Sequence, residues 1–374
     1  MGLTSNKVLV LAMVFAVALF AGTVWLWPRL ARHSWRAVGG RIGMLLVTQL
    51  ALFASVGLAA NQAFGFYASW ADLFGQENGQ GVVVDHIADG ARSPIQVVST
   101  SRVTGVSSGA PQVAGQIQKV DILGRTTRIG APAFVYLPPE YFQARNRDRK
   151  FPVSVVLTGY PGTAQALVDK LRYPSTAQQL AKSGRMQPMI LVMMRPAVAP
   201  PRDTECVDVP GGPKTETFFA KDLRDSVMAR YRVDKTPASW GIIGDSTGGY
   251  CALKIAMHHP KSYAAAVGLS PYYNAPIDPT TGDLFHGDAN LRNRANLFWV
   301  LRHQAAPETS LLVTSSKIGE HNYKDTLKFI KSVQNTNVTR ISSIILPSGG
   351  HNFNTWRREI PEALQWLGTR LVSH

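Results

Sequence analysis

Residues 240–258 read WGIIGDSTGGYCALKIAMH, and this stretch predicts the fold of the domain around it. A short apolar run at 240–243 precedes the pattern G-x-S-x-G at 244–248, and a helical pattern then continues until Pro260. Strand, sharp turn and helix are the context in which this pattern exposes its serine at the carboxyl edge of a sheet. The glycines allow the chain to fold back closely without side-chain clashes. We therefore predict that Ser246 is a nucleophile.

From Gln116 onward, short apolar runs alternate with helical patterns, which is typical of an α/β fold with a mostly parallel sheet flanked by helices. The first two runs, at 116–123 and 131–137, predict an opening hairpin. Buried strands are predicted at 153–157, 189–194, 240–243, 264–269, 311–315 and 341–346. A last helix near 356–371 closes the predicted domain.

A serine hydroxyl needs a base to take its proton, so a histidine is expected near the last strand of such a sheet. His351 fits this expectation, because it follows the apolar run 341–346 and two glycines that would let its loop reach Ser246. His258 and His259 lie at a helix end, where we expect a capping role. We predict that His351 is the general base.

The third member of a triad must be a carboxylate that orients the imidazole, on a loop between nucleophile and base. Glu320 is the first acidic residue after the apolar run 311–316. Asp325 is the alternative, but it is expected to start the following helix, where a carboxylate stabilises the free amides. We favour Glu320.

An oxyanion formed at Ser246 needs preorganised hydrogen-bond donors. One is expected from the backbone N–H of Thr247, the residue after the nucleophile. The second is expected from the loop at 157–162, LTGYPG, where the Tyr160 N–H is our candidate because proline has no donor. A plain turn is the alternative for this loop.

Two apolar stretches at the front of the chain predict a membrane anchor over residues 1–71, with helices at about 8–27 and 42–64. A cleaved signal peptide is the alternative for the first stretch, although its apolar run exceeds the usual ~7–15 residues. The predicted connecting loop, 28–41, carries four arginines, namely Arg29, Arg32, Arg36 and Arg41. Positive charge marks the cytoplasmic side, so both chain termini are expected outside.

The remaining segments follow from this division of the chain. Residues 72–112 show no sustained periodicity and are predicted to be a linker, and 113–374 form the predicted α/β domain. The orientation of the helices would place this domain on the extracytoplasmic side of the cell membrane.

The formal net charge is +15, yet the basic residues are scattered and no recognised nucleic-acid motif occurs, so a nucleic-acid partner is not expected. A polyanionic envelope or anionic lipid headgroups are the expected neighbours, with simple solubilisation as the alternative. The two cysteines, Cys206 and Cys251, are too few for a zinc ribbon. One disulfide and two buried thiols both remain open, and no oligomeric state is indicated.

The segment from about 116 to 370 resembles the esterase D-like branch of the α/β-hydrolases, which includes feruloyl esterases, enterochelin esterases and mycolyltransferases. The matching pieces are LTGY at 157–160, GDSTGG at 244–249, the acidic turn at Glu320, and GGHNF at 349–353 with Trp356. The resemblance implies the α/β-hydrolase fold, a triad of Ser246, Glu320 and His351, and oxyanion amides from Tyr160 and Thr247. Two helices before such a domain are similar to membrane-tethered actinobacterial relatives.

These observations together predict a serine esterase or acyl hydrolase that forms an acyl-enzyme on an envelope or lipid-derived ester. The first alternative is a cell-envelope acyltransferase that moves the acyl group to a sugar or lipid hydroxyl. The second is a non-catalytic envelope binding protein on a hydrolase scaffold. The expected chemistry requires no metal and no organic cofactor.

Overall fold

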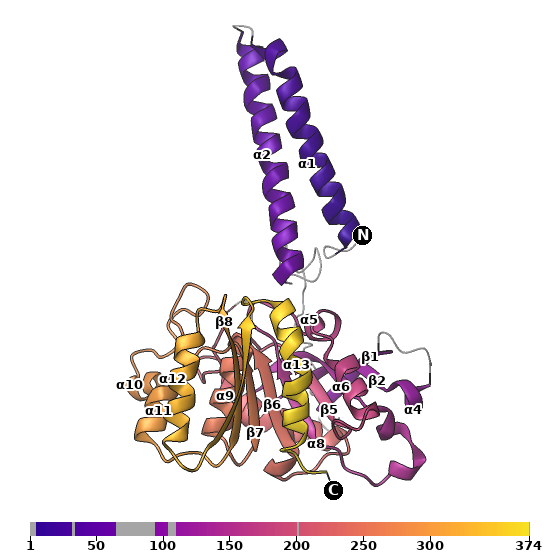
Figure 1. Ribbon diagram of the computed structural model, residues 1–374, viewed down its shortest axis with the longest axis vertical. Coiled ribbons are helices and arrows are strands. Elements are labelled where there is room, and N and C mark those ends of the chain that lie inside the picture. The colour runs from indigo at the N-terminus through magenta and orange to yellow at the C-terminus, as the bar shows by residue number, and fades with distance from the viewer. Residues whose placement is uncertain (1–4, 32–33, 65–93, 104–109, 200–201, 374) are drawn as a thin grey trace. The chain divides into compact units, whose positions relative to one another are not determined.

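The computed structural model describes residues 5–31, 34–64, 94–103, 110–199 and 202–373. The chain divides into two compact units, Met1–Asn78 and Gly79–His374. Figure 1 shows a pair of long helices in the first unit and a sheet with flanking helices in the second. The two units are described in turn.

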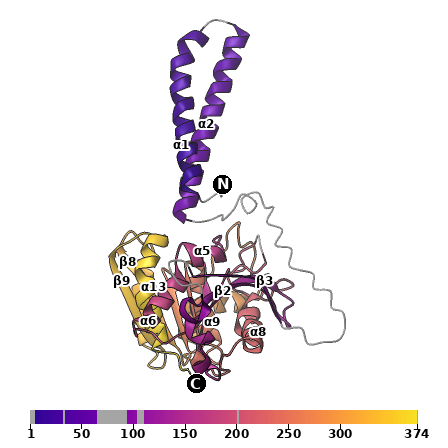
Figure 2. The ribbon, with the colours of Figure 1, turned by 90° about the vertical axis from the view of Figure 1, so that its right-hand side faces the viewer.

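The first unit contains helix α1 (Asn6–Leu26), the short 3₁₀ helix η1 (Trp27–Leu30) and helix α2 (Trp35–Phe64). Helices α1 and α2 lie side by side (Figure 2). The hydroxyls of Thr23 and Thr48 are 2.9 Å apart in the seam between them, and the amides of Asn6 and Gln62 also contact each other. By length and composition both helices could cross a membrane, a test that a signal sequence near the N-terminus also passes.

Helix α2 begins at Trp35, before the predicted start near residue 42. Arg36 and Arg41 therefore lie on the helix rather than in a loop spanning 28–41, while Arg32 lies outside the described residues. The hydroxyl of Ser34 accepts the Ala37 N–H at 3.2 Å and so caps the helix start. Arginine is a good helix former, so the charges do not end the helix where the apolar pattern stops.

The second unit is built on one sheet. Within the described residues its nine strands run in the order β1-β2-β3-β5-β4-β6-β7-β8-β9. The pairs from β1 to β5 are antiparallel, and the pairs from β5 to β9 are parallel. The strands are β1 (Ile95–Ser101), β2 (Gln116–Leu123), β3 (Gly130–Leu137), β4 (Val153–Leu157), β5 (Ile190–Met194), β6 (Trp240–Asp245), β7 (Ala265–Leu269), β8 (Ser310–Ile318) and β9 (Arg340–Ser348).

Helices cover both faces of this sheet, and each face has its own apolar core. One core packs against α8, α9, α11 and α12, and the other against α5, α6 and α13. The helices are α4 (Pro111–Ala114), α5 (Ala164–Asp169), α6 (Tyr173–Lys182), α7 (Thr215–Thr217), α8 (Leu223–Arg230), α9 (Thr247–His258), α10 (Ala289–Arg294), α11 (Leu297–His303), α12 (Tyr323–Gln334) and α13 (Phe353–Gly368). Short turns of other helix types are η2 (Pro139–Phe142), η3 (Ala144–Asn146), η4 (Phe218–Asp222) and η5 (Pro237–Ser239). The predicted α/β class is confirmed.

Strand β1 corrects the prediction of a linker over 72–112, because it pairs with β2 and belongs to the sheet. Only Ile95 of this strand is buried. A strand is predicted from alternating apolar and polar residues. An edge strand that exposes most of its residues to solvent lacks this alternation, so the sequence did not indicate β1. Residues 72–93 of the predicted linker lie outside the described residues.

Candidate active site

Ser246 follows strand β6 directly and lies at the N-terminus of helix α9, with φ 52° and ψ −120°. A side chain at either flanking glycine would prevent this turn. A Cβ on Gly244 would come within 2.3 Å of the Gly248 backbone, and one on Gly248 within 2.4 Å of the Leu157 carbonyl oxygen. The structure therefore gives the G-x-S-x-G segment the sharp turn expected of an exposed nucleophile.

His351 lies in the loop after β9, and its Nε2 is 2.8 Å from Ser246 Oγ. Its side chain is 45% exposed, so small molecules can reach the pair from solvent. The ring packs edge to face on Trp356 of α13, with 5.1 Å between ring centroids. The loop and the helix after it thus hold the imidazole in front of the serine hydroxyl.

Glu320 lies behind the imidazole, with its Oε2 3.5 Å from His351 Nδ1 and its side chain 1% exposed. Its other oxygen accepts the Ser270 hydroxyl at 2.7 Å, and Ser270 Oγ accepts the Trp356 indole N–H at 3.0 Å. These bonds fix the carboxylate in one orientation. Asp325 lies exposed in the first turn of α12, the position expected for an acidic residue that stabilises a helix start.

The two loops of the predicted oxyanion site meet because their strands are neighbours. Strands β4 and β6 pair in parallel with Leu157 opposite Gly244, so the loop carrying Tyr160 and the turn carrying Ser246 leave the sheet at the same edge. Thr247 begins α9, where a first-turn N–H has no acceptor within the helix. The structure thus brings together the side chains of Ser246, His351 and Glu320, and it places the loop that carries Tyr160 and the turn that carries Thr247 at the same edge of the sheet.

Asp245 is a site residue that the sequence analysis missed. Its carboxylate is fully buried, and its Oδ2 accepts the Gly159 N–H at 2.9 Å. Oδ1 has no hydrogen-bond partner within the described part of the chain. Burial raises the pKa of Asp245 to about 7, against the opposing effects of the Gly159 N–H and His351. A charged residue at an otherwise apolar strand end was the available signal.

A family model described as "Putative esterase" matches residues 127–367, which is more than half of the chain. The chain belongs to this esterase family. The matched segment contains every residue of the predicted triad and of the two predicted oxyanion loops.

One relative and two solved structures are also similar to this chain. Over 245 residues the chain is 24% identical to an uncharacterized protein of Corynebacterium glutamicum, covering 64% of this chain and 57% of that protein. A ferulic acid esterase superposes with a TM-score of 0.59 and 18% identity, covering 69% of this chain and 98% of the other. An S-formylglutathione hydrolase from Agrobacterium tumefaciens gives a TM-score of 0.57 and 16% identity, covering 74% and 100%. Both structures show the α/β-hydrolase fold.

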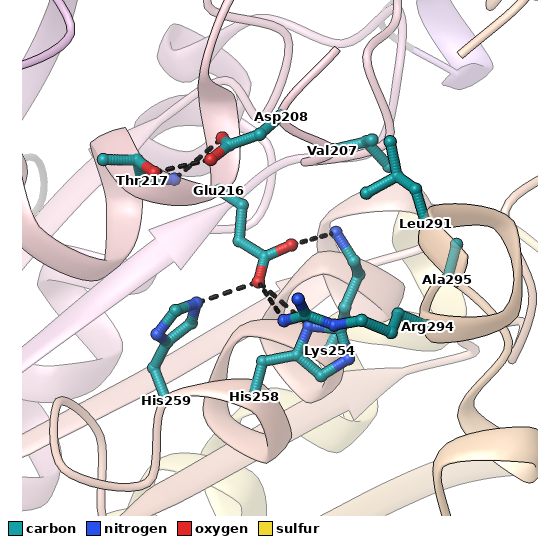
Figure 3. Close-up of a pocket in the computed structure, with 10 residues that line it drawn as sticks. All are labelled: Val207, Asp208, Glu216, Thr217, Lys254, His258, His259, Leu291, Arg294 and Ala295. Atoms are coloured by element: carbon teal, nitrogen blue, oxygen red, sulfur yellow. Dashed lines mark hydrogen bonds and ion pairs between the residues drawn. The ribbon is translucent and has the colours of Figure 1, made fainter. Parts of the chain in front are cut away.

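A second polar cluster in this esterase-family chain lies at the opposite end of α9 from Ser246 and surrounds Glu216 (Figure 3). Lys254 Nζ lies 2.8 Å from Glu216 Oε2, while His258 and His259 lie 2.9 and 2.8 Å from Oε1. The predicted capping role of these histidines is therefore wrong, because their tertiary partner lies 42 and 43 residues earlier in the chain. The cluster lines a cavity of about 200 Å³ that also reaches Arg294.

The charges of this cluster compensate one another. Burial opposes ionisation of Glu216, but the Lys254 ammonium and the two histidines outweigh it and hold the Glu216 pKa well below its usual value. Burial lowers the pKa of His258. We interpret the cluster as a clasp that holds α7, α9 and α10 together.

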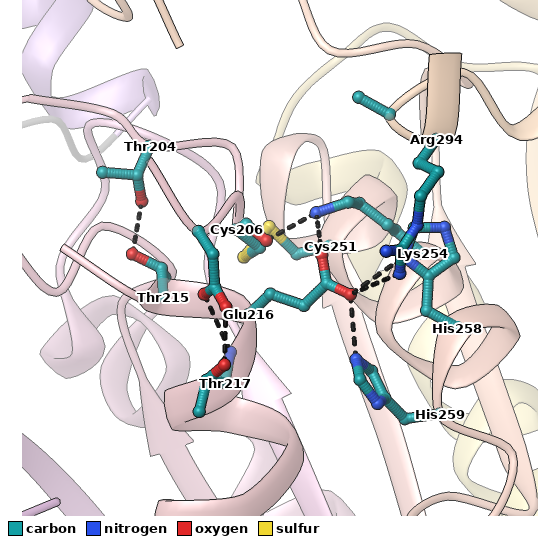
Figure 4. A network of polar contacts seen from close by, with 12 residues as sticks. Thr204, Cys206, Thr215, Glu216, Thr217, Cys251, Lys254, His258, His259 and Arg294 are labelled. Atoms are coloured by element: carbon teal, nitrogen blue, oxygen red, sulfur yellow. Dashed lines mark hydrogen bonds and ion pairs between the residues drawn. A yellow bond between two sulfur atoms is a disulfide. The ribbon is translucent and has the colours of Figure 1, made fainter. Parts of the chain in front are cut away.

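Cys206 and Cys251 form a disulfide beside this clasp, which decides between the two states that the sequence left open. The Lys254 ammonium also donates to the Cys206 carbonyl oxygen at 2.5 Å (Figure 4). The segment before Cys206 is thus joined to the helix that starts at the nucleophile.

Proposed function

We propose that the domain is a serine esterase that cleaves a carboxylic ester through an acyl-enzyme on Ser246. The observation that carries this proposal is the 2.8 Å distance between Ser246 Oγ and His351 Nε2, at the sheet edge of a chain that belongs to an esterase family. Membership of the family supports an ester substrate, and the geometry supports nucleophilic catalysis.

The proposed reaction has two halves. His351 takes the Ser246 proton as Oγ attacks the ester carbonyl carbon, and His351 then gives that proton to the leaving alcohol as the ester bond breaks. In the second half a water loses a proton to His351 and attacks the acyl carbon, so that Ser246 is released with its proton and the acid departs. The Tyr160 and Thr247 amides stabilise the oxyanion in both halves.

Glu320 acts on the imidazolium that forms in each half. The carboxylate faces Nδ1, so it stabilises the charged ring and keeps Nε2 directed at Ser246. The hydrogen bond from Ser270 to Glu320, and the one from Trp356 to Ser270, limit the movement of the Glu320 carboxylate. Its preorganisation therefore rests on β7, β8 and α13 together.

We also propose that helices α1 and α2 anchor the chain in the cell membrane, with the catalytic domain outside the cytoplasm. The length and apolar composition of both helices support the anchor. The Cys206–Cys251 disulfide supports the placement, since such bonds persist in oxidising compartments. An envelope or lipid-derived ester is the proposed substrate class, because an anchored site meets such molecules at the membrane.

A fluorophosphonate probe tests the catalytic proposal, since it reacts covalently with an activated serine. We expect labelling of the wild type, none for Ser246→Ala, and strongly reduced labelling for His351→Ala. Ser332→Ala, which removes a partly exposed hydroxyl on α12 that donates to the Lys328 carbonyl oxygen, is the matched control and should label normally. An unlabelled wild type would support a non-catalytic binding protein instead.

Product analysis separates hydrolysis from transfer. The enzyme would be incubated with an ester, with and without a sugar or glycerol acceptor, and the products separated by mass. Hydrolysis predicts free acid in both reactions. Dominant formation of the acylated acceptor would identify a transferase.

A reporter fused to the C-terminus tests the proposed orientation. Alkaline phosphatase, which needs an oxidising compartment, should be active in this fusion. A reporter active only in the cytoplasm would contradict the extracytoplasmic placement.

A further inference from the structure

Glu205 is a buried carboxyl in an unusual backbone conformation. It is 2% exposed, and both Glu205 and its neighbour Cys206 have positive φ, 48° and 51°. A positive φ is unfavourable for a residue with a Cβ, and burying a carboxyl adds a further cost. Such features persist only where surrounding contacts enforce them, and they cluster at functional sites.

Contacts on both sides of Glu205 enforce this conformation. On one side, Thr204 donates its hydroxyl to Thr215 Oγ1 at 2.9 Å. On the other, Cys206 is bonded to Cys251 of α9 and accepts the Lys254 ammonium (Figure 4). Glu205 is therefore held at a fixed position against the nucleophile helix.

The carboxyl of Glu205 faces Tyr272, whose hydroxyl lies 2.7 and 2.6 Å from its two oxygens. The Tyr272 ring stacks on Tyr250 of α9, with 5.0 Å between centroids. Tyr250 lies in the first turn of α9, where its backbone N–H donates to the Ser246 carbonyl oxygen at 3.0 Å. The contacts from Glu205 through Tyr272 therefore end on the helical turn that carries Thr247.

The electrostatics suit a position near a developing oxyanion. Burial and the nearby Asp203 raise the pKa of Glu205 to about 9, and Asp278 acts in the same direction, while Tyr272 and Lys254 oppose it. At neutral pH the group is uncharged and accepts a hydrogen bond through its carbonyl oxygen. It therefore adds no negative charge beside the site where an oxyanion forms.

We propose that Glu205 and Tyr272 are positioning residues that fix the first turn of α9 and, with it, the oxyanion amide of Thr247. This inference rests on the proposed esterase function. Donors aimed at an oxyanion act on the transition state more than on bound substrate, so their misplacement lowers kcat and leaves KM nearly unchanged.

Three variants test the proposal in the full chain with a chromogenic ester. Tyr272→Phe keeps the ring and removes the hydroxyl, and Glu205→Leu removes the acceptor at similar size. We expect kcat to fall on the order of 10-fold in both, with KM within about twofold, a partial loss compared with deleting an oxyanion donor. Glu205→Gln keeps a carbonyl acceptor without ionising and should recover most of the kcat lost in Glu205→Leu.

Tyr273→Phe is the matched control, because Tyr273 is the adjacent buried tyrosine and its hydroxyl donates to Thr326 at 3.0 Å. Its melting temperature should fall about as much as that of Tyr272→Phe, while its kcat should stay at the wild-type value. A fall in kcat for Tyr272→Phe no larger than that of the control would overturn the positioning role. If Ser246→Ala then still abolished hydrolysis, the proposed esterase function would stand. A wild type without Ser246-dependent hydrolysis would contradict both the esterase function and the positioning role.

Discussion

Asp245 Oδ2 accepts the Gly159 N–H at 2.9 Å, so the residue before the nucleophile binds the residue before Tyr160. The loops after β4 and β6 are thereby joined at the point where an oxyanion would form. A Cβ on Gly159 would lie 3.0 Å from Ser246 Cβ, which shows how closely the two loops pack. Ser246, the proposed nucleophile, and the loop that carries Tyr160 are therefore positioned by one shared set of contacts.

Removing the Asp245 carboxylate should loosen this arrangement. In Asp245→Ala the buried Gly159 N–H has no acceptor, and a lost buried hydrogen bond of this kind costs about 1–3 kcal/mol. We expect kcat for a chromogenic ester to fall roughly 10-fold or more, with a smaller change in KM. Steady-state kinetics of Asp245→Ala beside Asp245→Asn, which keeps an oxygen acceptor, check this. Equal activity of Asp245→Ala and wild type would contradict the role.

The raised Asp245 pKa predicts a pH dependence of stability. With a folded-state pKa of about 7 against 3.8 for the free side chain, the folded state holds a proton that the unfolded chain releases. The stabilisation that Asp245 gives the folded state is therefore full below about pH 4 and is lost as the pH rises through 7. Glu205 and Glu359, whose pKa values burial raises to about 9 and about 8, act in the same direction at higher pH.

The comparison with Asp245→Asn isolates this group. Urea denaturation gives the free energy of unfolding of both proteins at pH 5 and at pH 8. Between these two pH values it should decrease less in Asp245→Asn than in the wild type. A variant that loses as much stability as the wild type over that interval would show that Asp245 is ionised normally.

Glu320 and Asp325 should differ sharply in their effect on activity. Glu320→Gln removes the charge that faces His351 Nδ1, and we expect kcat to fall at least about 100-fold. Asp325→Asn removes a charge from the first turn of α12 and should cost about 0.5 kcal/mol of stability with kcat within about twofold. Kinetics and thermal melting of both variants decide the assignment. The reverse result would make Asp325 the triad acid.

The disulfide should stabilise the folded domain by about 3–4 kcal/mol, given the sequence separation of 45 between its cysteines. The double variant Cys206→Ser, Cys251→Ser should lose this amount in urea denaturation. Reductant should lower the unfolding midpoint of the wild type and leave that of the variant unchanged. A wild type insensitive to reductant under unfolding conditions would mean that the bond contributes nothing.

Glu216→Gln should destabilise the domain because it leaves the buried Lys254 ammonium without its counter-charge. Breaking a buried ion pair from one side costs about 3–5 kcal/mol. Because the folded-state pKa of Glu216 lies well below 4.5, its contribution to stability is full above that pH and decreases progressively as the pH falls from 4.5 toward the lower folded-state pKa. Denaturation at pH 7 and pH 4 should show the gap between wild type and variant narrowing in acid. A constant gap would argue against an ionised Glu216.

Much of the fold could be predicted because its strands are continuous apolar runs. Strand β2 has the predicted bounds, and β4 agrees equally well, since both are bounded by turn residues. Ser246 directly follows β6, and His351 follows β9 after two glycines, so local patterns placed both at one sheet edge. Strand β1 was not predicted because its exposed side chains show no periodic apolar pattern.

The remaining features depend on contacts between distant parts of the chain. Glu205 meets Tyr272 across 67 residues, and no spacing rule predicts that pair. The two cysteines carried no information about their geometry until the backbone placed them together. The histidines at the end of α9 follow a local capping rule in sequence, but a buried carboxylate competes for them in the folded protein.

The Thr23–Thr48 contact determines how the two N-terminal helices are aligned. Apolar side chains are nearly interchangeable neighbours, so a purely apolar seam would allow one helix to slide along the other. The hydroxyl pair forms at a single offset, and a mismatch loses this contact between the helices, while Thr23 keeps its bond to the Leu19 carbonyl oxygen at 2.8 Å. Replacing either threonine with valine would therefore remove one of the polar contacts that set the register of the two helices and leave the contact between Asn6 and Gln62 to hold it.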